Sequence, residues 1–326
     1  MTASGLADTV AAEYAAARKA AGLVDLTDRA VLEATGPQRQ KFLQGMLSND
    51  VLGLPPGRGC LAALMTAKGH VQVLLRALVE KDAVVLEMPA DRLELVERTL
   101  NHYRVAAPVR FKARATVVLG LLGPQVPDVV HRAGVDVPDL GPGAHAQVTV
   151  AGRPAILAYA PDLPGGGRVA HVSPEDGPAV REALRAAGAR PIGRETVDIL
   201  RVEALRPWYG PDVTEDNLLH ETGLLGEYAL STKGCYIGQE VVARLDARGG
   251  HVNKELRGLT LSAPVAAGTK LLAGDKEVGR ITTPAVSPRL GPIALGYVHR
   301  SHFAAGTVLR AGEASATVVT SFREGS

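Results

Sequence analysis

The stretch Lys233-Gly234-Cys235-Tyr236-Ile237-Gly238-Gln239-Glu240 decides how the rest of this 326-residue chain is interpreted. It combines one of only two cysteines with two glycines that free the backbone, and the residues after it, Val241 to Leu245, are typical of a helix. A cysteine just before a helix lies near the positive end of the helix dipole, and Lys233 adds a positive charge, so both favour the thiolate. The alternative is a small apolar cysteine packed beside a glycine turn, because free cysteines are among the most buried residues.

The composition indicates a globular protein of two or three domains. Hydrophobic residues make up 46% of the chain, which is enough for a sizeable core. The formal net charge of +2 and the lack of a basic tail argue against a nucleic-acid partner or an anionic membrane surface. Cys60 and Cys235 lie far apart and form no Cys-x-x-Cys motif, so we expect a reducing compartment and no zinc site built from cysteine.

Neither a membrane span nor a signal peptide is expected. No apolar run approaches the roughly 20 residues that cross a bilayer. The first residues, Met1 to Tyr14, carry Asp8 and Glu13 and have no basic n-region. We therefore expect a cytoplasmic protein with no membrane partner.

The octapeptide, running on through Val-Val-Ala-Arg, resembles the signature of YgfZ-type folate-binding proteins, which are relatives of the aminomethyltransferase (T-protein) of the glycine cleavage system. The segments Ala21 to Leu26 and Phe42 to Val51 are similar to the opening of both groups, and Gly279 to Val298 resembles the terminal barrel of T-proteins. The resemblance implies an α+β, T-protein-like fold. Two interleaved α+β subdomains, roughly 1–110 and 111–250, and a C-terminal β-barrel at 251–326 would surround a central folate channel.

The same resemblance implies tetrahydrofolate, or a one-carbon derivative of it, as the cofactor. The segment Leu200 to Ala204 is similar to the superfamily's Arg-x-Glu-Ala segment, whose glutamate accepts two hydrogen bonds from the pterin ring, and this points to Glu203. A carboxylate suits two parallel donors because it accepts both in a fork. The alternative is an ordinary salt bridge between Glu203 and a neighbouring arginine. Leu205 departs from the glycine that usually follows in the family.

The remaining candidate residues are expected around the channel. Cys235 would be the functional thiol at the channel mouth. The residues expected to bind the folate or shape its surroundings are Lys233, Tyr236, Gln239, Glu240, Arg244, Asn49 and Asp50. Arg244 lies four residues after Glu240, so the alternative there is a helix ion pair worth only about 0.3–0.5 kcal/mol. For Asn49 and Asp50 the alternative is an ordinary helix end and turn.

The function implied by the resemblance is that of a tetrahydrofolate-binding factor for the assembly or repair of iron–sulfur enzymes. Its expected partners are folate and those enzymes or their assembly proteins. T-proteins carry an aspartate pair after the hairpin turn, and matching that loop to this chain places Val73 and Leu74 there. Neither side chain holds a charge or moves a proton, and no Asp or Glu occurs between Asp50 and Glu80. We therefore expect a binding protein rather than an enzyme.

Two enzyme hypotheses stay open. The first is a folate-dependent aminomethyltransferase or demethylase, a tetrahydrofolate-dependent one-carbon transferase. The second is a hydrolase with Cys235 as nucleophile and His220 or His251 as its base, although neither histidine has a third partner placed by the sequence.

Overall fold

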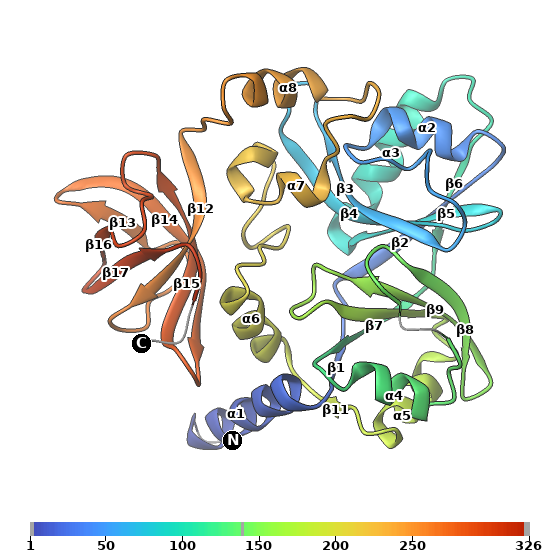
Figure 1. Cartoon of the computed structure of the whole chain (residues 1–326), viewed down its shortest axis with the longest axis horizontal. Coiled ribbons are helices and arrows are strands. Elements are labelled where there is room, and N and C mark those ends of the chain that lie inside the picture. Colours follow the sequence, from blue (N-terminus) through green and yellow to red (C-terminus); the bar gives the residue numbers. More distant parts are fainter. Residues whose placement is uncertain (1–2, 138–139, 323–326) are drawn as a thin grey trace.

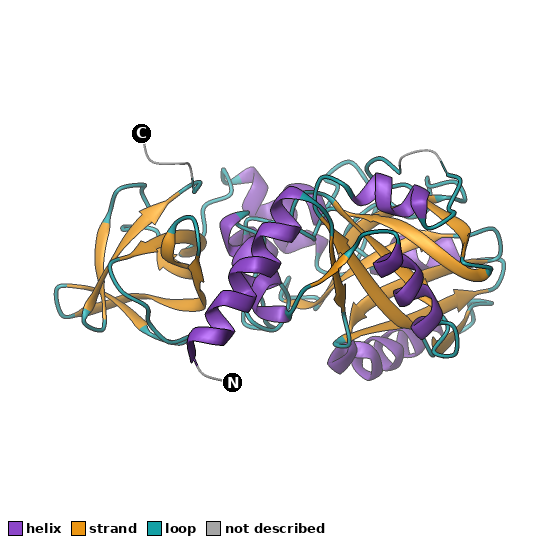
Figure 2. Cartoon of the chain, turned by 90° about the horizontal axis from the view of Figure 1, so that it is seen from below, coloured by secondary structure: helices purple, strands orange, loops and turns teal. Residues whose placement is uncertain are grey.

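The computed structural model describes residues 3–137 and 140–322, which form two β-sheets packed face to face and a separate β-barrel. Figure 1 shows the barrel set apart from the two-sheet body, with helices α1 and α6 between them. In the orthogonal view of Figure 2, α1 crosses the boundary between the barrel and the sheets. Among the described residues, no helix is long and apolar enough to cross a bilayer.

The first sheet has five strands in the order β3-β4-β5-β2-β6. Its strand β4 is buried on both faces over most of its length, which explains its nearly continuous apolar sequence. Helices α2 and α3 pack on the outer face. The elements are β2 (Arg29–Thr35), α2 (Arg39–Met46), β3 (Arg58–Met65), β4 (Val71–Val79), β5 (Ala83–Pro89), the 3₁₀ turn η1 (Ala90–Arg92), α3 (Leu93–Arg104) and β6 (Arg110–Arg114).

The second sheet has six strands in the order β11-β1-β7-β10-β9-β8, and helices α4 and α5 cover its outer face. Strand β1 precedes the first sheet in the sequence but pairs with β7 and β11, so the N-terminal segment is part of the second sheet. The elements are β1 (Gly22–Asp25), β7 (Val117–Leu122), α4 (Val126–Arg132), β8 (His145–Val150), β9 (Arg153–Ala160), β10 (Gly167–Val172), α5 (Gly177–Ala186) and β11 (Arg190–Pro191).

The inner faces of the two sheets share one hydrophobic core. Val31 and Val85 of the first sheet pack in the same cluster as Val118 and Val169 of the second. The helices α1 (Ala3–Lys19) and α6 (Arg194–Glu203) complete this cluster. Because one core joins both sheets, residues far apart in the sequence meet along the seam between them.

The segment between α6 and the barrel crosses the β3–β4 hairpin and contains η2 (Leu219–Thr222), α7 (Leu225–Tyr228) and α8 (Gln239–Ala247). Gly238, the residue before α8, has a φ of +85°, and a Cβ there would lie 2.7 Å from the carbonyl oxygen of Thr66. Only glycine fits this close approach without strain. The glycine of the octapeptide therefore lets α8 begin directly against the hairpin turn.

The last six strands form a closed barrel in the order β12-β15-β14-β13-β16-β17. Closure leaves no unpaired edge strand. Two charged residues of α6 reach the barrel strand β14: the Nη2 of Arg201 donates to Thr283, and Glu203 accepts from Ser287. The strands are β12 (Lys254–Leu261), β13 (Lys270–Ala273), β14 (Lys276–Ser287), β15 (Gly291–His299), β16 (Val308–Ala311) and β17 (Ala314–Val319).

Candidate functional site

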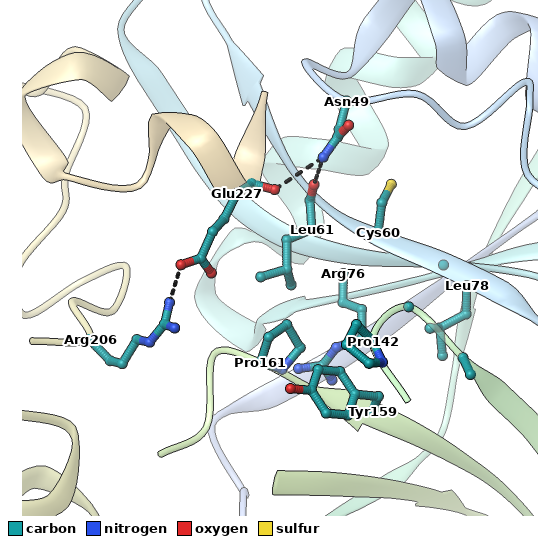
Figure 3. Close-up of a pocket in the computed structure, with 13 residues that line it drawn as sticks. Asn49, Cys60, Leu61, Arg76, Leu78, Pro142, Tyr159, Pro161, Arg206 and Glu227 are labelled. Atoms are coloured by element: carbon teal, nitrogen blue, oxygen red, sulfur yellow. Dashed lines mark hydrogen bonds and ion pairs between the residues drawn. The ribbon is translucent and has the colours of Figure 1, made fainter. Parts of the chain in front are cut away.

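A cavity of about 330 Å³ opens where the inner faces of the two sheets meet the crossing segment. Figure 3 shows its wall formed by strands of both sheets and by the segment that carries α7. This size is at the lower end of the range typical of small-molecule sites. We call it the first cavity; its lining residues are Asn49, Gly59, Cys60, Leu61, Arg76, Leu78, Pro142, Gly143, Ala144, Tyr159, Pro161, Arg206 and Glu227.

Asn49 holds two walls of the first cavity together. Its side-chain amide donates to the carbonyl oxygen of Leu61 at 2.8 Å and to that of Glu227 at 3.1 Å (Figure 3). Its amide oxygen accepts from the backbone N–H of Asp50 at 2.9 Å. Of the two polar residues expected at the channel, Asn49 lines the cavity. Asp50 instead accepts from the N–H of Gly53 and closes the turn that follows.

An ion pair lies at the mouth of the first cavity. Arg206 donates to the carboxylate of Glu227, and both side chains are partly exposed, at 31% and 41%. Such a pair adds little stability, because solvent screens it. The carboxylate of Glu227 is thus available to exchange Arg206 for another donor. Tyr159 and Pro161 supply a flat, partly apolar surface opposite.

A buried network of charged side chains forms the floor. Arg76 donates to Glu87 at 2.6 Å and to Asp162, and its side chain is only 3% exposed. Arg29 lies 3.8 Å from Glu87 and 3.7 Å from Asp162. Two guanidinium groups and two carboxylates therefore balance in charge, which is what permits such groups to stay buried.

Glu87 is the centre of this network. Burial alone would raise the pKa of its carboxyl, but Arg76 and the hydrogen bond from His171 outweigh burial and hold that pKa well below its ordinary range. The Nε2 of His171 lies 2.8 Å from the carboxylate, so it carries the proton and donates. Glu87 is consequently ionised at neutral pH and binds groups from both sheets.

Cys60 also lines the first cavity, but its thiol points away from it, because Cys60 pairs with Ala77 on the face of the sheet opposite Arg76 (Figure 3). Burial raises the pKa of this thiol to about 12, and its Sγ lies 3.4 Å from the carbonyl oxygen of Asp50. Cys60 therefore carries a protonated, unreactive thiol that does not face the cavity.

Lys233 does not point at the octapeptide's thiol. Its buried Nζ donates to the carbonyl oxygens of Gln44 at 2.7 Å and Asn49 at 3.0 Å, and to that of Leu47. The ammonium lies 4.8 Å from the ring centre of Tyr236, which is also buried. Burial lowers the pKa of Lys233 to about 8, so the side chain is mostly cationic at pH 7. The expectation that Lys233 adds positive charge beside Cys235 is replaced by a role in fixing the loop.

Cys235 itself is exposed. It lies between the buried Lys233 and Tyr236, and the side-chain oxygen of Gln239 accepts from the N–H of Tyr236 at 3.2 Å. Glu240 and Arg244 are exposed on α8, and the structure records no ion pair between them. None of these residues lines the first cavity; they lie on the thiol loop and on the helix that follows it.

Glu203 lies in a different place from Asn49. It lines a second cavity of about 470 Å³ together with Arg18 and Arg289. Its Oε1 accepts from Tyr14 at 2.8 Å and from Ser287 at 2.5 Å, and its Oε2 lies 3.4 Å from Arg289 and 3.6 Å from Arg18. The arginine salt bridge considered as an alternative from the sequence is therefore present. Both carboxylate oxygens already have donors from the protein.

His220, one of the two bases considered for a hydrolase, is also engaged. Its Nε2 lies 2.9 Å from Asp246 of α8, and the histidine side chain is buried. This pair joins η2 to α8. Within residues 3–137 and 140–322, no group of three or more His, Cys, Asp or Glu side chains is placed to hold a metal ion.

Two family models together cover most of the chain. The GCVT N-terminal domain matches residues 2–230, and the glycine cleavage T-protein C-terminal barrel domain matches residues 254–321. The chain belongs to the GCVT family. The predicted α+β, T-protein-like fold with a C-terminal barrel is thereby confirmed.

Several relatives of this GCVT protein span nearly its full length. A protein named as a probable aminomethyltransferase, from Halobacterium salinarum, is 30% identical over 342 residues, which are 96% of this chain and 90% of the relative. The aminomethyltransferase of Saccharopolyspora erythraea is 30% identical over 315 residues, 92% of this chain and 84% of the relative. The crystal structure of glycine cleavage system aminomethyltransferase T from Bartonella henselae superposes with a TM-score of 0.87 at 21% identity, over 96% of this chain and 88% of that one.

The cavity-facing side of β4 carries no carboxylate in this GCVT protein. Residues alternate between the faces of a strand, so Leu74 shares a face with Arg76 and Leu78, both of which line the first cavity. Leu74 is buried in a cluster with Tyr209 and Tyr228 of the crossing segment. The position considered for a T-protein aspartate is thus occupied by an apolar core contact.

Sequence reasoning did not find several residues of the first cavity: Arg76, Tyr159, Arg206 and Glu227. One signal was available. Arg76 interrupts the apolar run Val73 to Val79, and a charged residue inside a strand buried on both faces needs a buried partner. The partners Glu87 and Asp162 come from other strands and loops, which a single sequence does not bring together.

We expect the free energy of unfolding of Glu87→Gln to fall less steeply between pH 7 and pH 4 than that of the wild-type protein. A carboxyl with a depressed pKa in the folded state adds stability above its ordinary pKa of 4.5, and that contribution is lost as the pH falls below it. Removing a partner from a buried ionic network should itself cost about 3–5 kcal/mol at pH 7. Urea unfolding at pH 7 and pH 4 measures both effects.

The wild-type protein should lose more stability between these two pH values than Glu87→Gln does. Glu313→Gln, at an exposed barrel turn, is the matched control and should follow the wild type. An equal loss in the wild type and in Glu87→Gln would contradict the assignment of the acid-sensitive charge to Glu87.

Proposed function

We propose that the first cavity binds tetrahydrofolate or a one-carbon derivative, and that the protein is a YgfZ-type factor supporting the assembly or repair of iron–sulfur enzymes. The single observation that carries the proposal is structural. The loop of the YgfZ-like octapeptide is hydrogen-bonded through Lys233 to the main chain of Asn49, whose side chain lines the cavity. A ligand site and an exposed thiol are thus built on the same few residues.

A pterin ring requires a carboxylate that accepts two parallel N–H donors. Two glutamates are candidates, one in each cavity. Glu203 has four donor groups of the protein around it, so a pterin there would have to displace them. Among the described residues, the partly exposed Arg206 is the donor on the carboxylate of Glu227. We therefore favour Glu227 as the pterin acceptor, and Glu203 in the second cavity is the alternative.

The other polar groups of the first cavity suit the rest of a folate. Tyr159 and Pro161 offer a flat surface for a ring, and aromatic contacts of this kind add about 0.5–1.5 kcal/mol beyond burial. Once Glu227 turns to a pterin, Arg206 is released from the ion pair and becomes a further donor beside the same ring.

The proposed role for Cys235 rests on its exposure and on its buried neighbours. An exposed thiol held at a fixed place on the surface is accessible to a protein partner, whereas Cys60 is not. We propose iron–sulfur enzymes, or the proteins that assemble them, as these partners. Both cysteines are free thiols, which is compatible with the reducing cytoplasm proposed as the compartment.

The second candidate is a folate-dependent aminomethyltransferase or demethylase, which the names of the relatives favour. Leu74 and Arg76 on β4 weigh against it, because neither provides the base that proton transfer at a folate nitrogen requires. Purified protein with tetrahydrofolate and an aminomethyl or methylamine donor is expected to form no methylenetetrahydrofolate. Catalytic formation of that product would establish the enzyme instead.

We expect Glu227→Gln to weaken the binding of reduced folate by about ten- to a hundredfold, because a hydrogen bond to a charged acceptor is worth about 1.5–3 kcal/mol. Glu203→Gln should bind as the wild type does. Isothermal titration with 5-formyltetrahydrofolate, a stable reduced folate, measures both. The reverse pattern would move the pterin to the second cavity, and no binding by the wild-type protein would refute the proposed ligand.

We expect Cys235→Ser to bind folate as the wild type does but not to restore iron–sulfur enzyme activity in a deletion strain. The substitution keeps size and polarity but removes the sulfur, so only chemistry at the thiol is lost. A deletion strain carrying Cys235→Ser should keep the low iron–sulfur enzyme activity of the empty strain, whereas Ser231→Ala, an exposed change in the same loop, should restore it. Full restoration by Cys235→Ser would remove the thiol from the proposed function.

A further inference from the structure

Lys233 connects the thiol loop to the carboxyl end of α2. Its Nζ donates to the carbonyl oxygens of Gln44 and Leu47 at that helix end, and to the carbonyl oxygen of Asn49 two residues after Leu47. The last carbonyls of a helix have no partner within it, and a cation there is favoured by the helix dipole. We call Lys233 and these three carbonyls the lysine bridge.

Asn49 takes part in the lysine bridge and in the first cavity at once. Its main-chain oxygen accepts from Lys233, while its side chain lines the cavity and crosslinks Leu61 to Glu227. A ligand that bonds to the amide of Asn49 competes with these two carbonyls. The ammonium of Lys233 is hydrogen-bonded to the same residue, so it lies one bond from any ligand contact made by Asn49.

On the other side, the lysine bridge controls the place of the thiol. Cys235 is exposed, but it lies between two buried residues, Lys233 and Tyr236, whose side chains are in contact. The intervening Gly234 is exposed, and a Cβ added there would touch nothing within 4 Å. The thiol loop is thus held by the residues on either side of Cys235: by Lys233 and Tyr236, and by the N–H of Ile237, which donates to the carbonyl oxygen of Gly45.

We propose that Lys233 is a positioning residue that couples the first cavity to Cys235, so that a bound ligand changes the rate at which the thiol reacts. This inference rests on the proposed reduced-folate site. A ligand can shift the thiol loop between two conformations only if it binds one of them more tightly. In this proposal, the contact that differs between the two conformations is the one to Asn49. Lys233 does not line the first cavity. Its proposed role is to move with Asn49 when a ligand binds and so to change the position of the thiol.

The test compares the alkylation of Cys235 by iodoacetamide with and without saturating 5-formyltetrahydrofolate, followed by mass spectrometry of the peptide. We expect the ligand to change the rate by about fivefold or more in the wild type, which is the lower end of measured couplings between sites. The same ratio is expected for Lys276→Met, an exposed lysine of the barrel. In Lys233→Met the ratio should fall to about one, and Lys233→Arg, which keeps a cationic donor, should recover part of it.

Titration separates this inference from the proposed function. No heat of binding in the wild type refutes the folate site itself, whereas binding without a change in the alkylation rate refutes only the coupling. Lys233→Met that binds the ligand and keeps the full ratio also overturns it. If Lys233→Met does not fold, Asn49→Ala takes its place: it keeps the carbonyl for Lys233 but loses the amide, and at saturation its ratio should be about one. An undiminished ratio in Asn49→Ala would overturn the proposal.

Discussion

The structure depends on a pair of charges buried between two sheets. Arg76 of one sheet binds Glu87 at 2.6 Å, and His171 of the other sheet binds the same carboxylate at 2.8 Å. Burying these groups costs more than hydrophobic side chains would, unless every charge is matched. Here Arg29 and Asp162 complete the match, so that two guanidinium groups face two carboxylates between the sheets. That arrangement leaves Arg76 at the floor of the first cavity.

A second set of buried contacts ties the barrel to this two-sheet body. Arg201 of α6 binds Asp212 at 2.5 Å and Thr283 of the barrel at 2.9 Å. Glu203 is the last residue of α6. Its carboxylate accepts from Ser287 and lies beside Arg18 and Arg289. The Arg-x-Glu pattern of Arg201 and Glu203 therefore lies at the junction of α6, the segment after it and the barrel. A glutamate that holds such a junction has little freedom to serve as a ligand acceptor as well.

The fold was predictable from the sequence because its signals are local or specific. The octapeptide resembles that of a known family, and its Gly238 is required because a Cβ there would collide with the carbonyl oxygen of Thr66. Short strands separated by turns predict the C-terminal barrel.

The residues that line the first cavity were only partly predictable. Asn49 was among the expected residues, but Arg206 and Glu227 were not. Both lie on the crossing segment, and the path of that segment is set by its packing against the β3–β4 hairpin. Lys233 was associated with the thiol from its sequence distance, whereas three carbonyls 184 to 189 residues away determine where its charge lies.

The first cavity and the exposed thiol of Cys235 lie in different parts of this GCVT fold. Leu74 on β4 is an apolar core residue, and burial raises the pKa of the Cys60 thiol to about 12. If the cavity binds a reduced folate, as proposed, neither side chain offers it a base or a nucleophile. The accessible sulfur, Cys235, is carried instead on a loop outside the cavity. In the proposed coupling, a ligand in the cavity influences that sulfur through the polypeptide, along the hydrogen-bonded route from the amide of Asn49 through its carbonyl to Lys233.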